Sequence, residues 1–206
     1  MSRLKLKVCG MRDPDNLRGL IKLQPDFIGF IFYDKSPRYV NSIDKDVLLH
    51  IPSGIKKVGV FVNESELKVL EIVEKYKLDF VQLHGDEGLQ FAQGLRSKGV
   101  KIIKVFRLRD SVPKAAQKYE DIASYLLFDT STSNFGGSGK HFDWNILKDY
   151  VFSVPFLLSG GIQHSDIKKI KSMKISQLVG IDVNSKFEIE PGLKDLELVK
   201  ISKVLL

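Results

Sequence analysis

The sequence predicts an α/β protein, a closed (β/α)8 or TIM barrel, in one domain that covers residues 1–206. Short apolar runs alternate with longer amphipathic segments along the whole chain. Eight such pairs fit at nearly even spacing, and each takes about 26 residues, near the lower size limit of this fold. An open doubly wound sheet also permits the alternation, but the even spacing of eight strands favours closure.

Each predicted strand is a short run rich in Val, Ile, Leu and Phe. Most of the runs are nearly continuous rather than strictly alternating, which is typical of strands buried on both faces of a parallel sheet. In chain order, the predicted strands are 4–9, 27–32, 57–62, 80–84, 101–106, 125–129, 154–159 and 178–183.

Amphipathic segments between these strands predict the outer helices. Segment 64–77 is apolar on one face and carries Glu and Lys on the other. Its predicted apolar residues are Leu67, Leu70, Ile72 and Val73. Segment 86–99 starts with acids and ends with a basic turn and a glycine, which are helix start and stop signals. A third helix is predicted from the stretch 165–174, with Ser165 as its N-cap.

The composition fits a globular protein and argues against several other classes. The chain is 43% hydrophobic, enough for one sizeable core, and its 28% of charged residues are interspersed in sign. No apolar run approaches the roughly 18 residues that a membrane span needs. Segment 1–10 alternates Lys with apolar residues, which is a poor match to a signal peptide. The single cysteine excludes an intrachain disulfide, so we expect a cytoplasmic protein.

The formal net charge of +7 raises the question of whether the protein binds an anionic partner. A nucleic-acid-binding protein gathers Lys and Arg on one stripe, whereas here they are scattered through almost every segment. Segment 56–63 faintly resembles the basic strand of an RNA-binding sheet but lacks its Gly-aromatic-Gly pattern. We therefore expect neither a nucleic-acid nor a membrane partner, and a small anionic substrate explains the charge as well.

The ends of the predicted strands carry the first candidate catalytic residues, since barrels of this kind keep their chemistry there. Asp129 follows the apolar run 125–128, where loss of hydration favours a protonated carboxyl that can deliver a proton. Cys9 ends the first strand beside basic residues, which hold a thiol near a pKa suited to a base. The alternatives are a capping or solvated acid at 129 and an inert core thiol at 9. If both are functional, they form an acid–base pair.

The last two strands predict an anion site. Paired glycines such as Gly160 and Gly161 let backbone N–H groups approach an anion closely, although a tight turn explains the pair equally well. The loops after strands seven and eight of such barrels are a recurrent phosphate site. The other strand-end candidates are Arg38, His84, Asp182, Asn184 and Ser185.

The glycine-rich segment 134–141 does not predict a nucleotide site. A P-loop requires Gly where Asn134 stands and Ser or Thr where His141 stands, and no G-x-G-x-x-G follows any predicted strand. The segment instead predicts a mobile cover that closes over Asp129 and excludes water. Of the four histidines, only His84 is at a strand end, so we expect no metal and no nucleotide cofactor.

Several motifs, each weak alone, occur together in one order between residues 7 and 195. They are Cys-Gly at 9–10, Ser-Pro-Arg at 36–38, Gln-Leu-His-Gly-Asp-Glu at 82–87, and Asp-Thr followed by Gly-Gly-Ser-Gly-Lys and Phe-Asp-Trp within 129–144. In combination they resemble the phosphoribosylanthranilate isomerase family of tryptophan biosynthesis. The resemblance implies a barrel enzyme that isomerises an aldose to a ketose.

The resemblance also implies roles for individual residues. Cys9 becomes the general base and Asp129 the general acid of an Amadori rearrangement. That reaction converts N-(5-phosphoribosyl)anthranilate into 1-(2-carboxyphenylamino)-1-deoxyribulose 5-phosphate without a redox cofactor. Arg38 would bind the anthranilate carboxylate in two parallel hydrogen bonds. The remaining candidates line the pocket, with the phosphate near Gly160, Gly161, Asn184 and Ser185, and with Asp182 and His84 in unassigned roles.

One segment departs from the family pattern. After the eighth strand the family usually reads Asp-Val-Ser-Ser-Gly-Val-Glu, whereas residues 182–188 read Asp-Val-Asn-Ser-Lys-Phe-Glu. We expect Asn184 to cap a short helix that points at the phosphate. Lys186 replaces a glycine, which matters if the backbone there requires a positive φ, and its ammonium offers a further phosphate contact.

Two other functions fit parts of the sequence. Indole-glycerol-phosphate synthase is a related phosphate-binding barrel, but it carries an extra N-terminal segment and catalytic lysines on inner strands, whereas the first strand here is predicted from residue 4. A non-enzymatic sensor would bind a phosphorylated ligand and would need neither Cys9 nor Asp129. The oligomeric state is left open between a monomer and a homodimer.

Overall fold

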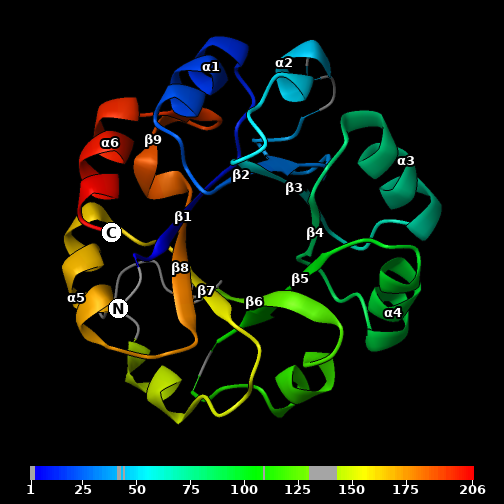
Figure 1. Ribbon diagram of the computed structural model, residues 1–206, viewed down its shortest axis with the longest axis vertical. Coiled ribbons are helices and arrows are strands. Elements are labelled where there is room, and N and C mark those ends of the chain that lie inside the picture. The colour runs from blue at the N-terminus through cyan, green and yellow to red at the C-terminus, as the bar shows by residue number, and fades with distance from the viewer. Residues whose placement is uncertain (1–2, 41–42, 44, 109, 130–142) are drawn as a thin grey trace.

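The computed structural model describes residues 3–40, 43, 45–108, 110–129 and 143–206. Eight parallel strands pair in chain order and close into a barrel through β1 and β8, with helices around the outside (Figure 1). The strands are β1 (Lys5–Cys9), β2 (Phe27–Ile31), β3 (Lys56–Phe61), β4 (Phe80–Leu83), β5 (Ile102–Arg107), β6 (Ala123–Asp129), β7 (Phe156–Ser159) and β8 (Leu178–Val183). The predicted barrel is confirmed, and each strand begins and ends within two residues of its expected bounds.

The helices connect successive strands. The α-helices are α1 (Pro14–Lys22), α2 (Lys45–Leu49), α3 (Glu66–Tyr76), α4 (Leu89–Ser97), α5 (Ile167–Ser172) and α6 (Leu196–Val204). Short 3₁₀ helices are η1 (Lys114–Tyr119), η2 (Trp144–Asp149), η3 (His164–Asp166) and η4 (Ser185–Phe187). α1 starts where the sequence provides both signals, because the Asp13 carboxylate accepts from the Asn16 amide and Pro14 opens the first turn.

Two predicted details of the helices are wrong. Leu67 was expected on the apolar face of α3, but it is 80% exposed. The buried face runs instead through Val69, Ile72 and Tyr76, which share one side of the helix, and Leu67 falls on the other. Ser165 does not cap the later helix: it lies inside η3, whose capping box is formed by Gln163 and Asp166.

The barrel has an outer and an inner core. Alternate strand residues such as Leu6 and Val8 pack between the sheet and the helices. The residues between them face the interior, where an apolar cluster fills the barrel. That inner cluster consists of Phe27, Val58, Phe80, Ile103, Val105, Leu127 and Leu157, with Tyr125 and Val179 packed against it.

A two-stranded hairpin that the sequence did not predict follows β8. It is formed by β9 (Glu188–Glu190) and β10 (Leu193–Lys194), paired antiparallel. Asn16 of α1 fixes its position: the side-chain amide donates to the Lys194 carbonyl at 2.9 Å and its oxygen accepts from the Lys194 N–H at 2.8 Å. This double hydrogen bond holds the hairpin against the first turn of α1.

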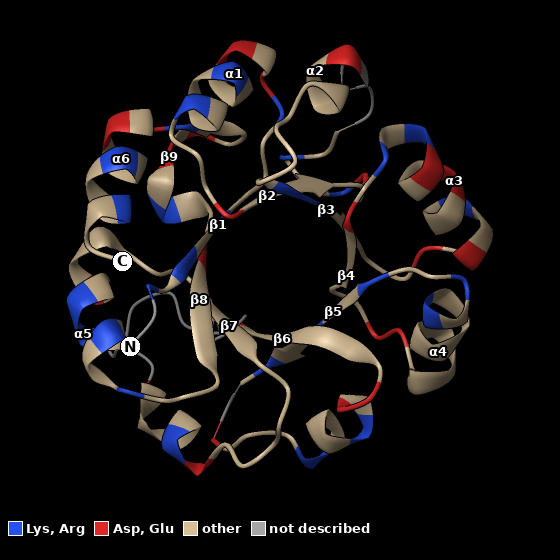
Figure 2. Ribbon diagram, viewed as in Figure 1, with Lys and Arg blue, Asp and Glu red and all other residues tan. Residues whose placement is uncertain are grey.

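Charged residues of both signs are spread over the ring of helices (Figure 2). None of the described helices is both long and apolar enough to span a membrane. In the part of the chain that the structure describes, no group of three or more His, Cys, Asp and Glu side chains is placed to hold a metal ion.

Candidate active site

Strand alternation turns the predicted catalytic residues toward the barrel interior. Leu126 and Phe128 of β6 belong to the outer core, so Asp129 faces inward at the end of its strand. In the same way, Leu6 and Val8 of β1 face outward and Cys9 faces inward. Both residues therefore lie at the carboxyl-terminal mouth of one closed barrel, where this fold places its chemistry.

Cys9 is almost fully buried, at 4% exposure, and its sulfur lies against β2. A Cβ atom added to Gly29 would come within 2.7 Å of the Cys9 Sγ, so the missing side chain makes room for the thiol. Burial raises the pKa of Cys9 above its ordinary value, and the nearby Lys7 and Lys194 lower it by less. This differs from the expected near-neutral thiol, because desolvation outweighs the neighbouring cations.

A buried network joins β1, β8 and β7 beside Cys9. The Lys7 ammonium donates to the Asp182 carboxylate at 2.8 Å, with side-chain exposures of 0% and 5%. The other carboxylate oxygen of Asp182 accepts from the Ser159 hydroxyl at 3.3 Å. Each carboxylate oxygen of Asp182 therefore has a partner in the protein, one on β1 and one on β7.

His84 lies between Asp129 and the buried side chain of Gln82. Its Nε2 lies 3.5 Å from the Asp129 Oδ2, and its Nδ1 lies 2.9 Å from the side-chain Nε2 of Gln82. The hydrogen bond from Gln82 fixes the plane of the imidazole and turns Nε2 toward Asp129. Gln82 is itself buried, at 1% exposure, so a fixed side chain of β4 holds the imidazole on the side away from Asp129.

Arg38 has a carboxylate partner within the protein. Its Nε donates to both carboxylate oxygens of Glu188, at 2.8 and 3.0 Å, and its Nη2 donates to one of them at 2.5 Å. Glu188 also accepts from the fully buried Lys194 at 2.5 Å. One carboxylate thus lies between two cations and leaves one positive charge in excess at this rim. Among the described residues, the Arg38 Nη1 group donates to none, so its N–H groups are the part of the guanidinium that the ion pair does not use.

The two glycines after β7 form a left-handed turn. Gly160 has a φ of +102° and Gly161 a φ of +71°, which side chains with a Cβ rarely adopt. Open space lies above Gly161, where an added Cβ would meet nothing within 4 Å. The positive φ values give both glycines a conformational reason, and space lies beside Gly161. Anion binding at this pair stays a prediction.

The end of β8 differs from the expected cap. Asn184 precedes η4, but its side chain does not cap that helix. Its oxygen accepts from the Lys194 ammonium at 2.8 Å instead, since a buried ammonium competes better for it than a helix end of three residues. Ser185 and Lys186 are exposed, and Lys186 does not have a positive φ, so this backbone has no need of the family's glycine.

Comparisons with known proteins agree with this geometry. The chain matches the family model described as N-(5'phosphoribosyl)anthranilate (PRA) isomerase over residues 6–204. The chain belongs to this family. A protein of Parabacteroides distasonis named N-(5'-phosphoribosyl)anthranilate isomerase is 42% identical over 198 residues, which cover 95% of this chain and 90% of that protein.

Solved structures of this isomerase family share the fold. Phosphoribosylanthranilate isomerase from Thermotoga maritima is 30% identical, with a TM-score of 0.83, and the match covers 97% of this chain and 96% of that one. A second isomerase structure is 26% identical, with a TM-score of 0.79 and the same coverage. That protein was solved in complex with reduced 1-(o-carboxyphenylamino)-1-deoxyribulose 5-phosphate.

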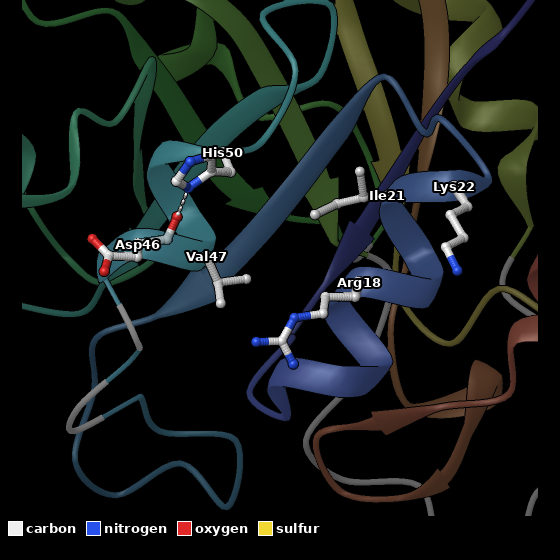
Figure 3. A pocket seen from close by; sticks show the side chains of 6 residues that line it. All are labelled: Arg18, Ile21, Lys22, Asp46, Val47 and His50. Atoms are coloured by element: carbon white, nitrogen blue, oxygen red, sulfur yellow. Dashed lines mark hydrogen bonds between the residues drawn. The ribbon is translucent and has the colours of Figure 1, made fainter.

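Two cavities open on the surface of this family member. One, of about 380 Å³, lies at the ends of β4 and β5 and is lined by residues that include His84, Arg107 and Tyr119. The other, of about 400 Å³, lies outside the barrel between α1 and α2 (Figure 3). Its lining residues are Arg18, Ile21, Lys22, Asp46, Val47 and His50, and none of the candidate site residues is among them. The first cavity therefore adjoins the candidate site through His84, and the second does not.

The sequence-based reading missed four residues of the site and proposed one element that the structure does not describe. Lys7 could have been found, since it has the same inward parity on β1 as Cys9. Gln82 has the same relation to His84. Glu188 and Lys194 gave no such signal, because they lie beyond the end of β8. The predicted cover, segment 134–141, lies outside the described residues.

Proposed function

We propose that Cys9 and Asp129 catalyse, in this chain, the isomerisation for which the family is named. The substrate is N-(5'-phosphoribosyl)anthranilate and the product is 1-(2-carboxyphenylamino)-1-deoxyribulose 5-phosphate, a step of tryptophan biosynthesis. The observation that carries the proposal is the placement of a thiol and a carboxyl, both facing inward, at the same mouth of a family barrel. The reaction moves protons only, so it needs groups that exchange protons at two atoms.

Asp129 acts first, as the general acid. Its proton goes to the ribose ring oxygen, the bond from that oxygen to C1′ breaks, and the anthranilate nitrogen forms a Schiff base with C1′. His84 faces the carboxyl with Nε2 at 3.5 Å. In this proposal a proton on that nitrogen stabilises the carboxylate that proton transfer leaves behind.

Cys9 acts second, as the general base. Its thiolate takes the proton from C2′, the electrons of that C–H bond form the enolamine, and the Schiff-base nitrogen becomes neutral. The enolamine then tautomerises to the ketone. An acid and a base held in place each contribute on the order of 10²- to 10⁴-fold to such a reaction.

Arg38 is proposed to bind the anthranilate carboxylate. Glu188 occupies Nε and part of Nη2, so the carboxylate meets the Nη1 side of the guanidinium. The excess positive charge of the group formed by Arg38, Glu188 and Lys194 favours an anion at this position. In this proposal Glu188 fixes the position of Arg38 through Nε and Nη2, and Nη1 binds the substrate carboxylate.

The phosphate is proposed to bind across the ends of β7 and β8. Backbone N–H groups near Gly160, Gly161, Asn184 and Ser185 are the proposed donors, with Asp182 between them and the base. The open left-handed turn after β7 and the buried Lys194 beneath Asn184 support this position. Lys186 is exposed and close in sequence, and it adds positive charge to the same rim.

We also infer that the enzyme works in the cytoplasm on this small phosphorylated substrate, as a monomer or a homodimer, with no nucleic-acid or membrane partner. The interspersed surface charges support this (Figure 2), because a nucleic-acid-binding face would be basic throughout. Light scattering reports the mass, and elution from heparin at low salt reports nucleic-acid-like binding.

The deciding experiment follows anthranilate fluorescence after addition of enzyme to freshly made phosphoribosylanthranilate. The emission is expected to disappear without added metal or nucleotide. Cys9→Ser and Asp129→Asn are each expected to lose about 10²- to 10⁴-fold in kcat while circular dichroism shows a folded protein.

The matched control is Asp121→Asn, which changes an exposed carboxylate just before β6, at the opposite end from Asp129. This variant is expected to keep wild-type kcat. Near-normal kcat for Asp129→Asn would refute the acid assignment. Binding of the product without any turnover by the wild-type protein would instead support a sensor.

A further inference from the structure

Lys7 is a charged residue inside the barrel that the proposed reaction steps do not use. Its side chain is fully buried, on the inner face of β1 and two residues before Cys9. An ammonium group in such a place is costly unless it is paired and hydrogen-bonded. Asp182 supplies that partner at 2.8 Å.

Stability alone is a poor reason for this ion pair. Buried pairs cost nearly as much in lost hydration as they gain, and apolar residues of similar volume often replace them without loss. Apolar packing is available here, because the layer of the barrel interior below Lys7 is an apolar cluster. The ion pair lies one inward position before Cys9 on β1, directly beneath the thiol, which points to a task connected with it.

The charged groups around Cys9 come from four elements. They are Lys7 on β1, Asp182 on β8, Lys194 on β10 and Arg38 after β2. Arg38 and Lys194 share Glu188 at the rim, whereas Lys7 lies deeper, on the same strand as the thiol. Among the cations, Lys7 lowers the pKa of Cys9 most, through its charge and a hydrogen bond, and Asp182 raises it.

We propose that Lys7 is the counter-cation of the Cys9 thiolate, a positioning residue that Asp182 and Ser159 hold beneath the base. The inference rests on the proposed role of Cys9. Lys7 keeps its three protons throughout: the thiol proton leaves to water, the thiolate forms beside the ammonium, and the thiolate then takes the C2′ proton. The ammonium of Lys7 thereby stabilises the thiolate of a base that is only 4% exposed, and this needs neither a metal nor a neighbouring imidazole.

Asp182 sets the strength of this effect. Its two oxygens are shared between the Lys7 ammonium at 2.8 Å and the Ser159 hydroxyl at 3.3 Å. The carboxylate keeps Lys7 protonated, since burial alone lowers the pKa of Lys7 and Asp182 helps to raise it above its ordinary value. It also repels the thiolate, so the two residues act on Cys9 with opposite signs.

The test is a titration of the thiol itself. Cys9 is the single cysteine of the chain, so the ultraviolet absorbance of the thiolate, recorded against Cys9→Ser, reports this group and needs no turnover. Lys7→Met is expected to move the thiolate midpoint to higher pH by at least about one unit, a tenfold loss of thiolate below the midpoint. The acid limb of the kcat/KM profile is expected to move with it, and kcat/KM is expected to recover as the pH rises.

Lys57→Met is the matched control. Lys57 is a second buried lysine, on β3, and its ammonium donates to the carbonyls of Leu48 and Tyr76 on the outside of the barrel. Its loss is expected to lower stability and to leave the Cys9 titration unchanged. An equal shift in both variants would mean that any buried lysine affects Cys9 through general loosening, and it would overturn the proposal.

Asp182→Asn decides the matter if Lys7→Met does not fold. It keeps the shape of the side chain and removes the negative charge, so the thiolate midpoint is expected to fall. A midpoint that stays or rises overturns the role of Lys7. Failure of the proposed function has a different signature: Cys9→Ser would retain turnover, while the titrations of the Lys7 and Asp182 variants would still shift in opposite directions.

Discussion

Arg38 and Glu188 form an ion pair across the barrel rim between side chains 150 positions apart in the chain, with the guanidinium Nε and Nη2 both on the carboxylate. Such fork-like contacts fix the plane of the guanidinium as well as its place. Lys194 secures the carboxylate from the opposite side. The orientation of Arg38 is therefore set within the protein, which would reduce the ordering cost of the proposed carboxylate binding.

Arg38→Lys tests this orientation. A lysine keeps the charge but cannot make parallel hydrogen bonds to two carboxylates, so one of them loses its partner. We expect KM to rise about tenfold or more, consistent with ~1.5–3 kcal/mol for a hydrogen bond to a charged group, while kcat changes less. Steady-state fluorescence kinetics give both constants. An unchanged KM would count against the carboxylate-binding role.

Glu188→Gln tests the pH dependence of the same ion pair. Burial alone raises the pKa of Glu188, but hydrogen bonds from Arg38 and Lys194 outweigh it, so the pKa lies below the ordinary 4.5. The pair therefore stabilises the fold above that ordinary value, and this contribution is lost as the pH falls through the lowered pKa. Urea unfolding at a series of pH values is expected to show a smaller acid-induced loss for the variant. Parallel curves for both proteins would refute the coupling.

Gly29→Ala tests the space reserved for the thiol. The added methyl group would lie 2.7 Å from the Cys9 sulfur and 3.1 Å from its Cα, and the backbone cannot move away freely. We expect a loss of about 1–3 kcal/mol in unfolding free energy, as for other overpacked cores, and a lower kcat. Gly54→Ala, where the methyl would meet nothing within 4 Å, serves as the control. Equal stability of the two variants would show that β2 adapts.

Gln82→Leu tests the support beneath His84. Without the amide, the imidazole loses its hydrogen bond at Nδ1, so Nε2 is no longer held toward Asp129. We expect kcat to fall about tenfold, in the lower part of the range for proton-transfer groups, with little change in KM. Gln93→Leu, on the exposed face of α4, is expected to leave both constants unchanged. A normal kcat in Gln82→Leu would leave His84 without a role in orienting the acid.

Much of the fold could be predicted because barrel strands have a local signature. Runs such as 27–31 and 156–158 are apolar on both faces, and the second is followed by Ser159 and two glycines, which mark the strand end. The positions of Cys9 and Asp129 followed from the same signal. Helix faces were less certain: Leu67 is apolar yet exposed, since hydrophobicity alone does not fix which side of a helix meets the sheet.

The charge environment of the site could not be predicted in the same way. Asn184 has the residue type of a helix cap, but Lys194 takes its oxygen, and that lysine comes from a hairpin with no sequence signal of its own. The basic residues near Cys9 were visible, whereas the burial that outweighs them depends on how the whole barrel closes. Such pairings join residues far apart in the chain, which a local pattern does not encode.

The double hydrogen bond between Asn16 and Lys194 has a consequence for the order in which a new chain matures on the ribosome. The ribosome adds Cys9 long before Asp182 and Lys194, the residues that alter its electrostatic surroundings. Synthesis proceeds at about 5–20 residues per second, so the cysteine emerges many seconds before its surroundings exist. Until the hairpin of β9 and β10 docks, the nascent protein carries the Cys9 thiol without Lys194 beside it.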